Sequence, residues 1–118
     1  MKNDEHLVQK AICEYLDIRR VCYFAIPNGG SRKGGAIEGA RLKNEGVKSG
    51  VPDLFFVWEG MSYFLEVKRP KNGIIPRGRV SKNQTEMMDR LTDNGAECAV
   101  VYCVADVIEK FIDWGIGH

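Results

Sequence analysis

The spacing of apolar residues predicts four helices. Apolar side chains recur at three- and four-residue intervals over residues 4–18, about 36–45, 81–94 and about 106–114. We expect the second helix to turn one face inward, carrying Ile37, Ala40 and Leu42, and Gly46 to end it. We expect the last helix to bury Val107, Ile108, Phe111 and Ile112. Ser81 and Gln84 have the spacing of a capping box, which indicates where the third helix begins.

Shorter apolar runs between these helices predict strands. Residues 21–26 form a mostly apolar run that ends at Pro27. Residues 97–104 are almost continuously apolar, which is typical of a strand buried on both faces. Two further β-rich runs flank Glu59-Gly60, a pair suited to a tight turn, so we expect a β-hairpin there.

The hairpin would bring three charged side chains together. A two-residue loop at Glu59-Gly60 places Asp53 directly opposite Glu66, and Lys68 follows on the same face because strand side chains alternate. A loop longer by two residues places Asp53 opposite Lys68 and keeps all three on one face. A slip of one residue would separate them, so the prediction depends on the register.

The element order and the composition both indicate one α/β domain over residues 1–118, with a mixed four-stranded sheet flanked by helices. The 44% hydrophobic and 28% charged content is ordinary for a soluble protein. No apolar run suits a membrane span, and the polar start does not resemble a signal peptide. We therefore expect no membrane association and a cytoplasmic protein, bacterial or viral within its host. The four cysteines form no CxxC pair, so buried reduced thiols are expected rather than a zinc site.

Cations are concentrated in one segment, although the formal net charge is only +1. Between Lys68 and Lys82 there are six cations and no acid, and prolines and glycines predict irregular structure. Such a run is most often a solvated loop. Its position directly after the Glu66-x-Lys68 strand favours contact with phosphate instead. A second basic loop contains Arg32 and Lys33.

The predicted cluster suits metal-dependent phosphodiester hydrolysis. Two facing carboxylates repel each other unless a cation intervenes, and Mg²⁺ prefers oxygen ligands. Asp53 and Glu66 would supply them, and the backbone carbonyl of Val67 could add another. Lys68 could then orient a water and stabilise charge on phosphorus. The alternative is a set of solvated ion pairs at the end of the sheet.

These motifs resemble the virus-type replication-repair nuclease (VRR-NUC) domain of the PD-(D/E)xK nuclease superfamily. The resemblance covers most of the chain. It rests on Glu5 with Gln9, Pro27-Asn28-Gly29, Gly46, Gly50-Val51-Pro52-Asp53-Leu54, Leu65-Glu66-Val67-Lys68 and Ser81-x-x-Gln84.

The resemblance implies an αβββαβ core, a Mg²⁺ or Mn²⁺ cofactor and cleavage of branched DNA. It assigns catalytic roles to Asp53, Glu66, Lys68 and Gln84, and metal binding to Glu5, Asp53, Glu66 and the Val67 carbonyl. From the sequence alone, Glu5 would be a solvated first-turn glutamate. The expected DNA contacts are Arg32, Lys33, Arg69, Lys71, Arg77, Arg79 and Lys82.

Relatives of this size resemble Holliday-junction resolvases that act as homodimers. A two-fold symmetric junction requires two sites related by two-fold symmetry, so we expect a homodimer. Two alternatives remain: a nuclease for flaps, nicks or duplex ends with the same site, and a non-catalytic DNA-binding module.

Overall fold

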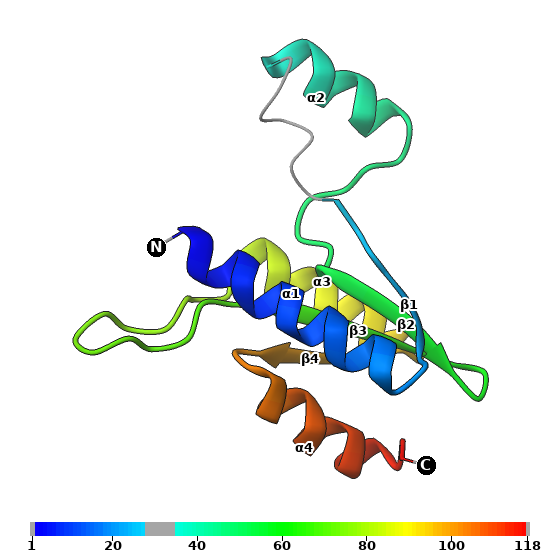
Figure 1. The fold of residues 1–118 in the computed structure, drawn as a ribbon. Coiled ribbons are helices and arrows are strands. Elements are labelled where there is room, and N and C mark those ends of the chain that lie inside the picture. The colour runs from blue at the N-terminus through cyan, green and yellow to red at the C-terminus, as the bar shows by residue number, and fades with distance from the viewer. Residues whose placement is uncertain (1, 28–34, 118) are drawn as a thin grey trace.

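The computed structural model describes residues 2–27 and 35–117 (Figure 1). The elements along the chain are α1 (Lys2–Ile18), β1 (Cys22–Ala25), α2 (Gly35–Asn44), β2 (Leu54–Trp58), β3 (Met61–Val67), α3 (Lys82–Asp93), β4 (Glu97–Val101) and α4 (Val104–Trp114). All the predicted helices and strands are present. The order contains the expected αβββαβ core, with α2 inserted between the first two strands and α4 added at the end.

The four strands form one mixed sheet in the order β1-β2-β3-β4. The first three strands are antiparallel and β4 runs parallel to β3. The fold is therefore α/β, as predicted. No helix in the described part of the chain combines the length and apolar character needed to cross a bilayer.

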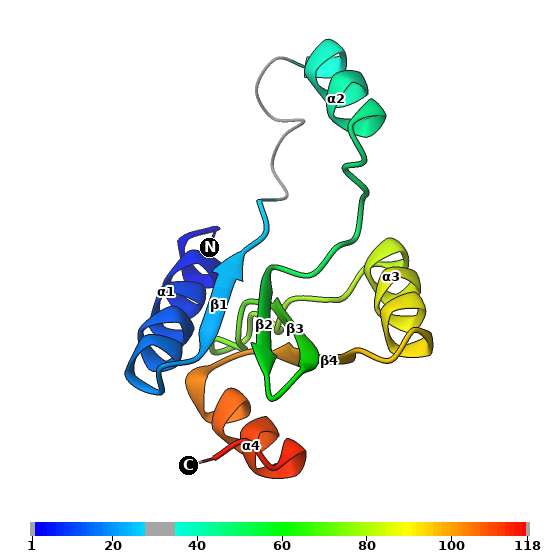
Figure 2. The same ribbon diagram turned by 90° about the vertical axis from the view of Figure 1, so that its right-hand side faces the viewer.

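The hydrophobic core lies between the sheet and the helices α1 and α4. Ile12 and Leu16 of α1 are buried, as are Val107 and Phe111 of α4. The two residues of each pair are four positions apart, so they lie on the same face of their helix. They meet alternate residues of the strands, such as Phe56 and Leu65, because side chains alternate between the faces of a sheet. Helix α3 lies on the other side, as Figure 2 shows. The core thus packs against one face of β2 and β3, and α3 approaches the opposite face.

The hairpin has the predicted two-residue loop. Trp58 pairs with Met61, and Leu54 pairs with Leu65. Glu59 and Gly60 both have positive φ, 49° and 82°, which is the conformation that a type I′ hairpin turn requires.

Four details of the fold differ from the predictions. Figures 1 and 2 show α2 standing away from the sheet, and Ala40 is exposed rather than packed inward. On α4, Ile108 and Ile112 are 41% and 74% exposed, because only a narrow stripe of this helix contacts the sheet.

Strand β4 is shorter than predicted and lies at an edge of the sheet, so its α3 side is only partly covered. The cysteines in the described residues were also wrongly expected to be buried. Cys22 and Cys103 are exposed and Cys13 and Cys98 are partly covered, all with free thiols.

Candidate nuclease active site

The register of the hairpin brings Asp53 and Glu66 face to face. Leu54 pairs with Leu65, so one step towards the open end of the hairpin sets Asp53 against Glu66. This confirms the register on which the proposed cluster depends. Pro52, which is fully buried, fixes the chain immediately before Asp53.

Asp53 is held by the backbone of the neighbouring strand. Its Oδ2 accepts a hydrogen bond of 2.7 Å from the Val67 N–H. The Asp53 N–H donates to the Leu65 carbonyl at 3.1 Å, and its own carbonyl accepts from the Ile26 N–H at 2.8 Å. Asp53 is thus tied to strands on both sides, which fixes the position of its carboxylate.

Glu66 is the only charged side chain that is buried in the described part of the chain, with 2% of it exposed. Its Oε2 accepts a hydrogen bond of 3.0 Å from Gln84 Nε2, and lies 3.6 Å from Lys68 Nζ. Its Oε1 is buried and has no hydrogen-bond partner among the described residues. A buried carboxylate oxygen without a donor is costly, so this atom needs a cation or a proton.

Burial raises the pKa of Glu66 from its ordinary value of 4.5 to about 8, and the adjacent negative charge of Asp53 adds to the rise. Lys68 acts in the opposite direction because its positive charge favours the carboxylate. In the absence of a metal ion, Glu66 therefore holds a proton at neutral pH. A strongly raised carboxyl pKa beside a second carboxylate is characteristic of functional sites.

Gln84 joins the site through the start of α3. Ser81 caps this helix, and the predicted capping box is present: Ser81 Oγ accepts from the Gln84 N–H at 3.1 Å. Gln84 Oε1 accepts from the Ser81 N–H at 2.8 Å. With its oxygen engaged there, the Gln84 amide must present its N–H₂ group to Glu66.

A close backbone contact fixes α3 against the strand that carries Asp53. Gly50 has φ +82°, and a Cβ placed on it would lie 2.4 Å from the Asn83 carbonyl oxygen. Only glycine allows this approach. The chain before Asp53 and the start of α3 are thereby held together, which sets the distance between Gln84 and Glu66. In the sequence, the Gly50-Val51-Pro52 segment indicates a special backbone conformation here, but nothing in it identifies Asn83 of α3 as the residue that Gly50 contacts.

Four of the predicted site residues are therefore brought together: Asp53, Glu66, Lys68 and Gln84. Val67 contributes its N–H to Asp53, while the role of its carbonyl stays a prediction. Glu5 lies half-buried on α1. Within residues 2–27 and 35–117, no three His, Cys, Asp or Glu side chains are grouped closely enough to hold an ion. The metal-binding role of Glu5 thus remains a prediction.

The cations predicted to bind DNA lie mostly on the segment after β3. Lys71, Arg77, Arg79 and Lys82 are exposed. Arg69 donates to the Pro76 carbonyl at 2.8 Å, and Lys82 Nζ lies 3.9 Å from the Glu86 carboxylate. Arg32 and Lys33 lie outside the described residues.

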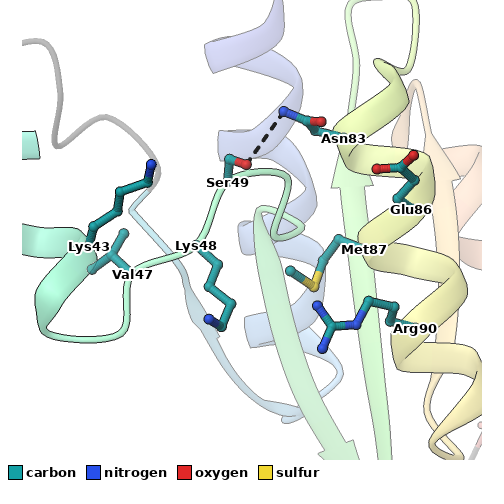
Figure 3. Close-up of a pocket in the computed structure, with 8 residues that line it drawn as sticks. All are labelled: Lys43, Val47, Lys48, Ser49, Asn83, Glu86, Met87 and Arg90. Atoms are coloured by element: carbon teal, nitrogen blue, oxygen red, sulfur yellow. Dashed lines mark hydrogen bonds between the residues drawn. The ribbon is translucent and has the colours of Figure 1, made fainter. Parts of the chain in front are cut away.

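A basic cleft of about 330 Å³ lies beside the site, and the sequence did not reveal it (Figure 3). It is bounded by the end of α2 with the segment that follows, and by α3; Asn83 Nδ2 donates a hydrogen bond of 3.5 Å to Ser49 Oγ. Its lining residues are Lys43, Val47, Lys48, Ser49, Asn83, Glu86, Met87 and Arg90. Lys48 and Arg90 approach it from opposite walls (Figure 3), so cations from distant parts of the chain converge there. Such a cleft can accept a phosphate group.

The comparison with protein families agrees with this geometry. A family model for the VRR-NUC domain matches residues 5–105. The chain belongs to the VRR-NUC family. The match spans the helix that carries Glu5, the Asp53–Glu66 hairpin and the start of α3. Neither the comparison with curated proteins nor the comparison with solved structures produced a match.

The VRR-NUC family is a family of nucleases, and the implied substrate is DNA. The facing carboxylates, the partly buried Lys68 and the nearby cations are consistent with that family.

Proposed function

We propose that the protein is a metal-dependent, structure-selective DNA endonuclease that cleaves branched DNA in the manner of a Holliday-junction resolvase. The observation that carries the proposal is the pair formed by Asp53 and Glu66, in which the buried Oε1 of Glu66 has no hydrogen-bond partner among the described residues.

The donor set fits a divalent cation. Asp53 and Glu66 offer carboxylate oxygens, the ligands that Mg²⁺ and Mn²⁺ prefer, and the Val67 carbonyl is the third candidate ligand. Lys68 alone does not balance the two carboxylates, since the pKa of Glu66 stays raised beside it. A bound cation would polarise a phosphate oxygen and lower the pKa of a coordinated water.

The chain's own residues then have separate tasks. The Val67 N–H fixes the Asp53 carboxylate, and Gln84 fixes Glu66 through the hydrogen bond to Oε2. Lys68 Nζ, with 13% of its side chain exposed, reaches solvent beside Glu66 and can hold an attacking water or the charged phosphate oxygens. When Glu66 gives up its proton, its second oxygen becomes available as a ligand.

The exposed cations on the segment after β3 supply the grip on the DNA backbone, and the Lys48–Arg90 cleft offers a second phosphate contact. We also propose that the active form is a homodimer, because two symmetric cuts need two sites related by a two-fold axis. Sedimentation of the protein with and without junction DNA tests this.

A cleavage panel tests the proposed activity. Synthetic four-way junction, flap, nicked duplex and linear duplex are incubated at equal concentration with Mg²⁺, Mn²⁺ or EDTA. The proposal predicts metal-dependent cleavage with the junction cut fastest, and loss of cleavage in Lys68→Ala with folding and DNA binding retained. Preference for flaps or ends would assign the same site another substrate. Equal cleavage by wild type and Lys68→Ala would overturn the proposed site.

A further inference from the structure

The segment that follows β3 contains no helix or strand, as predicted, but an isolated β-bridge between Asn72 and Ile75 folds part of it into a projection. We define residues 69–78 as the arm. It is closed at its base by a hydrogen bond of 2.8 Å from the Gly78 N–H to the Arg69 carbonyl. Near its tip, Asn72 and Ile75 exchange two backbone hydrogen bonds of 2.9 Å, as in an antiparallel pair. Figure 1 shows the arm extending away from the sheet.

Side-chain contacts hold the arm in this shape. The Arg69 guanidinium crosses it and donates to the Pro76 carbonyl at 2.8 Å. The Arg77 guanidinium lies 4.6 Å from the centre of the Tyr102 ring, a cation–π contact that attaches the arm to the chain after β4. The first of these contacts joins the two sides of the arm, and the second ties its base to the chain after β4.

The tip of the arm presents an apolar side chain to solvent. Gly73 makes the turn with φ +61°, and Ile74 is 99% exposed. A single exposed apolar residue is common on protein surfaces and needs no explanation by itself. Ile74 differs in its setting, because the exposed residues beside it on the arm include Lys71 and Arg77 and the segment contains no acid.

The arm is joined directly to the active site. It begins at the residue after Lys68, and Ile74 is six residues beyond Lys68. An extended chain rises roughly 3.3 Å per residue, so Ile74 can lie at most about 20 Å from Lys68. One DNA strand rises about 3.4 Å per nucleotide, so this distance corresponds to about six nucleotides.

We propose that Ile74 is a wedge that inserts between base pairs at the branch point of DNA, while the cations of the arm hold the flanking phosphates. This inference rests on the proposed function and specifies which feature of the substrate is recognised. Apolar side chains on basic projections unstack neighbouring bases where they enter a groove or a junction. This costs less at a branch point than inside a continuous duplex, because the stack of base pairs is interrupted there. The wedge places the scissile phosphate within about six nucleotides of the branch point.

The test follows base unstacking separately from cleavage. A four-way junction carrying 2-aminopurine at the branch point is titrated with protein in EDTA, and binding is followed in parallel by anisotropy. Wild type is expected to raise the 2-aminopurine fluorescence. Ile74→Ser is expected to lose most of that rise while its Kd changes by less than about threefold, because the phosphate contacts remain. Ile74→Leu is expected to retain the rise.

The matched control is Ile112→Ser, which replaces an isoleucine on α4 that is 74% exposed. It should behave as wild type. In Mn²⁺, Ile74→Ser should cut the junction at least about tenfold more slowly than wild type, and wild-type cuts should map within about six nucleotides of the branch point.

Equal fluorescence for wild type and Ile74→Ser would overturn the wedge. So would a change in sedimentation of Ile74→Ser with unchanged fluorescence, since that would assign Ile74 to an interface between copies. Wild-type protein that unstacks the probe but cleaves no DNA would overturn the proposed nuclease activity and leave the wedge standing.

Discussion

Gln84 Nε2 donates a hydrogen bond of 3.0 Å to Glu66 Oε2, while the oxygen of the same amide accepts from the Ser81 N–H that begins α3. One side chain therefore caps a helix and orients a buried carboxylate. Because the capping box fixes which end of the amide faces Glu66, the helix start and the candidate active site are coupled.

Replacing Gln84 should separate these two roles. Gln84→Ala removes both and should lower kcat/KM for DNA cleavage by about 10- to 100-fold, as for other groups that orient metal ligands. It should also cost about 1 kcal/mol of stability through loss of the cap. Gln84→Glu keeps the capping acceptor but loses the donor to Glu66, so it should retain stability and lose activity. Stability is measured by denaturant unfolding. If Gln84→Glu cleaves DNA as fast as the wild type, Gln84 does not act by orienting Glu66.

The contact between Gly50 and Asn83 predicts an unequal effect of two glycine substitutions. Gly50 and Gly60 share φ +82°, but only Gly50 has backbone where a Cβ would go, 2.4 Å from the Asn83 oxygen. Gly60→Ala should cost about 1–2 kcal/mol, the strain of a left-handed residue. Gly50→Ala should cost more than about 3 kcal/mol, because the same backbone strain is present and the new Cβ must also push α3 away. If the two substitutions lower the free energy of unfolding in urea equally, the close approach of Gly50 to Asn83 adds nothing to the cost.

The raised pKa of Glu66 predicts how the metal-free protein responds to pH. The folded state holds the Glu66 proton up to about pH 8, whereas the unfolded chain releases it near 4.5. The stabilisation is thus complete below the unfolded value and is lost as the pH rises towards 8. The slope is at most about 1.4 kcal/mol per pH unit.

Glu66→Gln isolates this contribution, since the amide cannot titrate. Unfolding of both proteins in EDTA between pH 5.5 and 7.5 should show the wild type losing stability relative to Glu66→Gln. Parallel curves would show that the Glu66 proton is not held by the fold.

The exposed cations Arg77 and Arg79, on the segment after β3, predict the salt dependence of DNA binding. The double variant Arg77→Ala/Arg79→Ala should weaken binding to every DNA sequence alike, and reduce the slope of log K against log salt by about 0.9 for each lost phosphate contact. Lys110→Ala is the control, because Lys110 is a cation on α4 that is not predicted to contact DNA. Its amine lies 6.0 Å from the centre of the Trp114 ring. An unchanged slope for the double variant would show that these arginines do not touch phosphate.

The sequence predicted those parts of the structure that depend on local rules. The loop at Glu59-Gly60 fixed the register of β2 and β3, and hence the pairing of Asp53 with Glu66. The capping box placed Gln84 at the start of α3. Both follow from backbone conformations that a few neighbouring residues determine.

What the sequence did not predict depends on contacts between distant segments. Nothing local indicates that Gly50 packs on α3, or that Lys48 and Arg90 share a cleft. Apolar periodicity also overestimated burial. Ile112 lies at the right spacing on α4 yet remains exposed, because the pattern does not show how wide a stripe the neighbouring sheet covers.

Titration calorimetry with Mn²⁺ is the most direct test of the central claim that Asp53 and Glu66 form a metal site. Wild-type protein without DNA, and the Lys68→Ala variant with uncleaved junction DNA present, should bind Mn²⁺ and release protons as they do so. Asp53→Asn, which keeps the shape of the side chain, should lose this binding while remaining folded. Absence of Mn²⁺ binding by the wild type, or equal binding by Asp53→Asn, would contradict the account.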